Sequence, residues 1–129
     1  MVGDTKDSTT SKKATGEAGE ARALAHLLAQ GLTLVQRNYR VARGPGARGG
    51  EVDLILRERD GTLVFVEVRS RRGGVGGGAA ASVSALKQTR IVRAAQHYLL
   101  RLPVLPRCRF DVVAIDGDEL QWLRGAFDA

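Results

Sequence analysis

The sequence of 129 residues is poor in the features that build disulfides, zinc clusters and membrane spans. Its single cysteine, Cys108, excludes a disulfide within the chain and a zinc site made of several cysteines. Segment 1–13 is polar and has no apolar core, so we expect a disordered tail there and neither a signal peptide nor a membrane span. These absences favour a cytoplasmic protein without membrane attachment.

Acidic residues are outnumbered, with 14 aspartates and glutamates against 20 lysines and arginines, which gives a net charge of +6. This excess favours a polyanionic partner, with DNA expected, because basic side chains attract phosphates. An arginine-rich composition can also reflect a GC-rich genome. The candidate nucleic-acid contacts are the arginines of two glycine-rich loops, Arg43, Arg48, Arg71 and Arg72. Solvated loop charge is the alternative for each of them.

Charged residues alternate with apolar ones in two short segments that have the pattern of strands, 51–56 and 64–69. Successive side chains of a strand point to opposite faces. The period of two therefore assigns Glu51 and Asp53 to one face of the first strand. Glu67 and Arg69 share a face of the second strand in the same way.

The connection between these strands decides whether the charged faces meet. A three-residue loop at 59–61, with its glycine in the left-handed conformation, makes the two faces agree. Asp53 then lies opposite Glu67, and Glu51 lies opposite Arg69. The sequence therefore predicts an antiparallel hairpin that brings acidic side chains together.

Opposed carboxylates at Asp53 and Glu67 would repel each other by about 3 kcal/mol at an effective dielectric near 20. A divalent cation removes that cost, and Mg²⁺ binds through one or two carboxylates with water and phosphate oxygens as its other ligands. Such an ion can activate water to hydrolyse a phosphodiester. The alternative is a solvated strand face with an ordinary cross-strand pair between Glu51 and Arg69.

The remaining pattern predicts a single mixed α/β domain over 14–129, with no internal repeat. Helical spacing and end signals predict helices over 15–30 and 82–102. Further strands are predicted over 32–41, 110–115 and 120–123.

Segments 50–55 (GEVDLI) and 65–71 (FVEVRSR) resemble the bacterial YraN family of small proteins. That family is similar to the restriction-endonuclease-like superfamily, which includes archaeal Holliday junction resolvases. The resemblance implies a mixed central β-sheet flanked by helices, with Asp53 and Glu67 at a metal site. It also implies that Glu20, on the first helix, can contribute to that site, although the helix dipole alone could explain an acid there.

The nuclease motif usually has lysine where this sequence has Arg69. A guanidinium group stays charged, so Arg69 could orient a phosphate or a water but could not act as a base. Lys87 is a second candidate, because it lies four residues before Ile91 on the apolar stripe of the helix predicted over 82–102. A lysine that snorkels at the end of that stripe is the alternative.

These features and the resemblance lead to one hypothesis, a Mg²⁺- or Mn²⁺-dependent nuclease that acts on DNA, with branched or recombination intermediates as candidate substrates. The candidate site residues are Asp53, Glu67, Glu51 and Glu20 for the metal, and Arg69 and Lys87 for water and phosphate. The first alternative is a catalytically inactive nucleic-acid-binding or DNA-repair accessory protein of the same fold. A protein-interaction module is the second. Because junction resolvases act as dimers, a homodimer is a further possibility.

Overall fold

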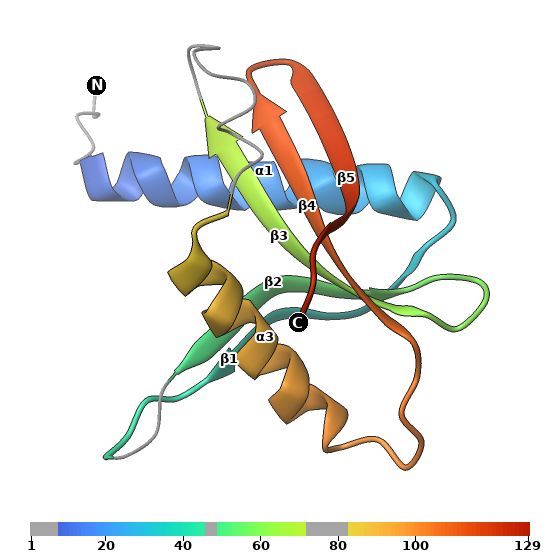
Figure 1. Ribbon diagram of the computed structural model, residues 1–129. Coiled ribbons are helices and arrows are strands. Elements are labelled where there is room, and N and C mark those ends of the chain that lie inside the picture. The colour runs from blue at the N-terminus through green and yellow to red at the C-terminus, as the bar shows by residue number, and fades with distance from the viewer. Residues whose placement is uncertain (1–7, 46–48, 72–82) are drawn as a thin grey trace.

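The computed structural model describes the backbone of residues 8–45, 49–71 and 83–129, and the side chains of these ranges from residue 16 onward. A five-stranded sheet in the order β1-β2-β3-β4-β5 forms the centre (Figure 1). Its strands are β1 (Thr33–Val41), β2 (Gly50–Arg57), β3 (Leu63–Arg71), β4 (Cys108–Asp116) and β5 (Glu119–Phe127). Only β3 and β4 run parallel among these neighbours.

The helices α1 (Ser8–Ala29) and α3 (Ala85–Leu99) cover opposite faces of the sheet (Figure 1). Together they make the mixed α/β architecture that the sequence predicts, and it is compatible with a restriction-endonuclease-like fold. Neither helix, within the described ranges, is both long and apolar enough to cross a membrane.

Two apolar cores follow from the alternation of side chains along β3. Phe65 points toward α3 and packs in a cluster with Ile91 of that helix. Val66 points the other way and packs with Leu27 of α1. A strand buried on both faces in this manner needs apolar residues at consecutive positions, which is the pattern of the β3 sequence.

Alternation is interrupted in β2, next to the acidic residues. A regular strand would place Val52 and Leu54 on the same face. Instead, Val52 packs on the α3 side and Leu54 on the α1 side. Asp53 therefore lies where the strand changes the face that it presents.

Helix α3 packs closely against the start of β2 because Gly50 has no side chain. A β-carbon at Gly50 would lie 2.7 Å from the carbonyl oxygen of Arg90 and 2.9 Å from the backbone nitrogen of Ala94. Any other residue would push helix and strand apart. The helix begins at a Ser84 cap, whose side chain accepts a hydrogen bond from the Lys87 N–H.

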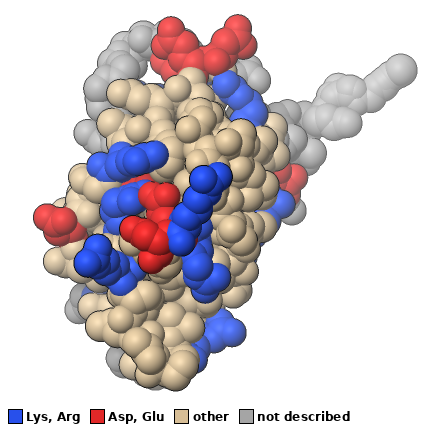
Figure 2. Space-filling view, turned by 90° about the vertical axis from the view of Figure 1, so that its right-hand side faces the viewer, with Lys and Arg blue, Asp and Glu red and all other residues tan. Residues whose placement is uncertain are grey.

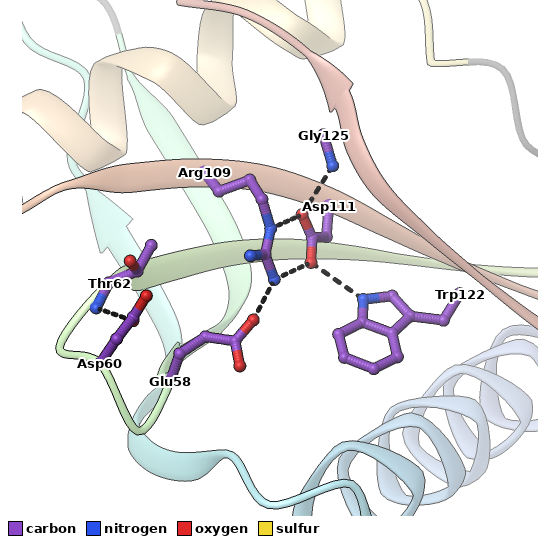
Figure 3. Close-up of polar contacts among 7 residues, drawn as sticks. All are labelled: Glu58, Asp60, Thr62, Arg109, Asp111, Trp122 and Gly125. Atoms are coloured by element: carbon purple, nitrogen blue, oxygen red, sulfur yellow. Dashed lines mark hydrogen bonds and ion pairs between the residues drawn. The ribbon is translucent and has the colours of Figure 1, made fainter.

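Strand β4 contains a fully buried acidic residue, Asp111. Its carboxylate accepts hydrogen bonds from Arg109 Nε at 2.8 Å, Trp122 Nε1 at 2.9 Å and the Gly125 N–H at 3.0 Å (Figure 3). Arg109 also pairs with Glu58 at 2.8 Å. Asp111 is thus an arginine partner that ties β4 to β5, and a structural acid.

The element boundaries differ most from the prediction in α1 and β5, whereas the helix predicted over 82–102 is shorter, Ala85–Leu99, and the other ends shift by one or two residues. Helix α1 begins at Ser8, earlier than the predicted 15–30, because segment 8–15 contains no glycine or proline to stop it. Of the tail predicted over 1–13, only 1–7 lies outside the described residues. Strand β5 continues past the predicted 120–123 to Phe127, because a register shift and the left-handed Gly125 allow pairing to resume.

Candidate active site

The turn between β2 and β3 has the predicted form, but the two strands separate where their acidic residues lie. Gly61 has the expected left-handed conformation, with φ of +94°, and Leu54 pairs with Val66. Within the described strands, the ladder between β2 and β3 ends at this pair. Beyond it, Asp53 Oδ2 accepts the Val68 N–H at 2.8 Å, so a side chain takes the place of the next backbone acceptor.

Asp53 and Glu67 meet at this opening, and their carboxyl groups share a hydrogen bond. Glu67 is only 5% exposed. Burial, followed by the negative charge of Asp53, raises the pKa of Glu67 to about 8. Burial also raises the pKa of Asp53, while its hydrogen bond from Val68 opposes that shift. At neutral pH the pair therefore retains a proton.

Lys87 reaches these acids from the first turn of α3. Its Nζ lies 3.5 Å from Glu67 Oε2 and 3.6 Å from Glu51 Oε2. Arg90, one turn further along the helix, places Nη2 3.3 Å from Glu51 Oε1. These contacts put the Lys87 ammonium against two of the acids, and its role in the chemistry remains a prediction. Arg90 is not among the site residues predicted from the sequence, although its spacing of three residues from Lys87 puts both on one face of the helix.

The predicted pairing of Glu51 with Arg69 is wrong. The strands have already separated at that level, and the carboxylate of Glu51 contacts α3 instead. Arg69 lines a pocket of about 340 Å³ beside the acid pair. The residues around this pocket are Glu67, Val68, Arg69, Ser70, Ser84 and Lys87. Two cationic side chains and one buried acid therefore face the same space.

Glu20 approaches the acid pair from α1, on the other face of the sheet. Burial and the negative charge of Asp53 raise the pKa of Glu20. Arg37, a hydrogen bond with the Asn38 side chain, and Arg40 oppose that rise. The structure thus puts Glu20 within electrostatic reach of Asp53. It also adds three neighbours from β1 that were not predicted as site residues.

The loop arginines predicted to contact nucleic acid are only partly described. Arg43 is exposed after β1, and Arg71 is exposed at the end of β3. Arg48 and Arg72 lie outside the described residues. Nucleic-acid contact by these four side chains remains a prediction.

The site lies within residues 19–115, which match the model of the uncharacterised protein family UPF0102. The chain belongs to this family. UPF0102 proteins of Methylibium petroleiphilum and an Acidovorax species are 68% and 69% identical to it over 117 residues. These alignments cover 91% of the chain, and 96% and 86% of the two relatives. A UPF0102 protein of Cupriavidus taiwanensis is 57% identical over 119 residues, covering 92% of the chain and 86% of that relative. The predicted membership of a YraN-like family is confirmed.

Asp53 and Glu67 of this UPF0102 protein present carboxylate oxygens, the type of ligand that Mg²⁺ prefers. Across the described residues, no three His, Cys, Asp or Glu side chains gather closely enough to hold an ion together. A pair of carboxylates suffices for Mg²⁺, which keeps waters or phosphate oxygens as its other ligands. The raised pKa values reflect burial and repulsion that a bound cation would relieve. Glu51 and Glu20 border the pair, and their part in metal binding remains a prediction.

Protonation of Glu67 predicts how stability depends on pH. Its pKa rises from 4.5 to about 8 on folding, so the folded state binds more protons than the unfolded state between these values. The free energy of unfolding should therefore fall as the pH rises through this window. Without divalent metal, Glu67→Gln should flatten this dependence and exceed the wild type in stability at pH 8 by a few kcal/mol.

Thermal unfolding in EDTA across that pH range measures the effect. Glu119→Gln removes a carboxylate from an exposed position of β5 and serves as the control. It should keep the pH dependence of the wild type. Identical profiles for Glu67→Gln and the wild type would show that Glu67 ionises normally.

Proposed function

We propose that this UPF0102 protein is a divalent-metal-dependent nuclease that hydrolyses phosphodiester bonds in DNA, with Mg²⁺ or Mn²⁺ as its cofactor. The observation that carries the proposal is the contact between Asp53 and Glu67 at the edge of a pocket that also contains Lys87 and Arg69. Burying two acids in contact lowers the stability of the fold, and binding of a cation would explain why both acids are placed there. Compatibility with a restriction-endonuclease-like fold adds support by analogy only.

Each side chain has a distinct role in this proposal. Asp53 and Glu67 would hold the ion, which would act as a Lewis acid and lower the pKa of a bound water. Glu67 must first release its proton to solvent, so activity should increase toward alkaline pH. Lys87 can donate hydrogen bonds to a phosphate oxygen or hold a water beside Glu67. Arg69 stays charged and can bind phosphate, but it cannot accept a proton.

An accessory protein that binds DNA without turnover is the second candidate. The Lys87 ammonium contacts Glu67 and Glu51, so it already offsets negative charge in the absence of a metal. Arg69 also replaces the lysine that the nuclease motif usually contains. Both observations fit a protein that keeps the nuclease fold but no longer cleaves DNA. The nuclease proposal also includes branched DNA as the substrate and a homodimer as the active form.

Cleavage and metal binding should depend together on Asp53. Mg²⁺ or Mn²⁺ should raise the thermal midpoint, because a ligand at 100 times its Kd adds about 2.7 kcal/mol to the free energy of unfolding. Asp53→Asn should abolish this shift and the cleavage of plasmid, single-stranded and four-way-junction DNA. Asp128→Asn, which changes an exposed aspartate near the C-terminus, should preserve both.

Cleavage that survives Asp53→Asn would point to a contaminating nuclease and count against the site. If the protein binds DNA but cleaves none in any divalent metal, the accessory function is the correct one.

The contacts of Lys87 predict that it, and not Arg69, is the important cation. Lys87→Ala should lower cleavage by about 10² to 10⁴, the usual worth of acid–base assistance, while Arg69→Lys should change little. Lys87→Arg keeps the charge but cannot lose a proton, so partial activity in that variant would indicate phosphate positioning. A rise in cleavage for Arg69→Lys, with an active Lys87→Ala protein, would reverse the assignment. DNA affinity is measured for every variant, because loss of a phosphate contact imitates loss of catalysis.

A further inference from the structure

Many basic side chains of this protein are already occupied by protein partners. Arg22 donates to the carbonyl oxygens of Gly117 and Asp118 at 2.7 and 2.9 Å. Arg109 is held by Asp111, while Lys87 bridges acids of the site. On the face shown in Figure 2, basic groups flank acidic groups at the centre. Net charge alone therefore overstates the positive charge that is available to a polyanion.

Arg37 and Arg40 of β1 differ from these side chains. Both are exposed. Neither forms a hydrogen bond or an ion pair within the described part of the chain, although both act electrostatically on Glu20. Their guanidinium groups are thus free to bind a ligand, and both lie near Glu20, which in turn interacts with Asp53.

The backbone between these arginines has an unusual conformation. Asn38 has φ of +50°, the only positive value at a non-glycine residue in the described ranges. The register pairs Arg37 with Leu54 and Tyr39 with Val52, which puts Asn38 across from Asp53. Asparagine tolerates the left-handed region better than most residues, but the conformation still has a cost and needs support from its surroundings.

This kink changes where the two arginines point. In a regular strand, Arg37 would share a face with Tyr39 and lie opposite Arg40. Tyr39, however, is 6% exposed and packs on the α3 side, whereas Arg37 is exposed. Both arginines interact with the carboxylate of Glu20, which belongs to α1. The left-handed residue therefore gathers two guanidinium groups on one side of the strand, beside Asp53.

We infer that Arg37 and Arg40 form a phosphate-binding edge that receives the DNA backbone next to the acid pair. A guanidinium group presents a planar fork of N–H donors that matches two phosphate oxygens. Two such groups on one side of β1 would hold phosphates that neighbour the one facing Asp53 and Glu67. This inference rests on the proposed function and names the edge along which its substrate lies.

The salt dependence of DNA binding tests the edge without any need for catalysis. A labelled duplex is titrated with each protein in EDTA over a series of salt concentrations. Removing each phosphate contact should reduce the log–log slope by about 0.9 on duplex DNA. The Arg37→Ala/Arg40→Ala double variant should lose about 1.8 from the slope. Arg57→Ala removes an exposed arginine at the opposite end of β2 and should retain the wild-type slope.

Substitutions of Asn38 test the kink itself. Glycine adopts the left-handed conformation freely, so Asn38→Gly should keep the wild-type slope. A β-branched residue does not, so Asn38→Val should turn one of the two arginines to the opposite face and lose about 0.9 from the slope. Thermal midpoints of both proteins establish that they are folded at the assay temperature. A folded Asn38→Val protein with the wild-type slope would contradict the role of the kink.

The outcomes separate this inference from the proposed function. Wild-type protein that binds DNA, together with a double arginine variant of equal slope, would overturn the phosphate-binding edge and leave the nuclease proposal standing. Wild-type protein that binds no duplex or single-stranded DNA at low salt would overturn both.

Discussion

The contact between Asp53 and Glu67 is the constraint on which the surrounding structure depends. Two buried acids of like charge remain together because β2 and β3 separate beyond Leu54 and Val66, which frees a backbone N–H for Asp53. Gly50 lets α3 approach closely enough for its first turn to face the acids. The separation of β2 and β3, the close packing of α3 and the proton shared by Asp53 and Glu67 therefore depend on one another.

The two buried acids of the sheet illustrate how a structural carboxylate differs from a functional one. Asp111 is surrounded by donors from an arginine, an indole and a backbone amide, so its charge is fully compensated. Glu67 instead hydrogen-bonds to another acid and has a lysine ammonium at 3.5 Å beside a pocket. The hydrogen bonds that compensate the charge of Asp111 stabilise the fold. The charge of Glu67 is compensated only in part, and a metal ion can supply the missing positive charge.

Much of the site could be predicted from local sequence rules. The glycine of the turn fixes the hairpin register, and that register brings Asp53 and Glu67 together, as the structure confirms. The partners of Glu51 could not be predicted in the same way, because they come from a helix more than thirty residues away and depend on how it packs. The left-handed conformation of Asn38 could not be predicted either, because asparagine tolerates that region but nothing in the immediate sequence requires it. Tertiary packing decides these features.

Proton release on metal binding tests the central claim most directly, that the protonated acid pair is a cation site. Mn²⁺ is titrated into the protein by calorimetry at pH 7, in two buffers with different heats of ionisation. Because Glu67 retains a proton near neutral pH and must lose it to become a ligand, about one proton should be released for each Mn²⁺ bound. Binding with equal heats in both buffers, or no binding at all, would contradict the account.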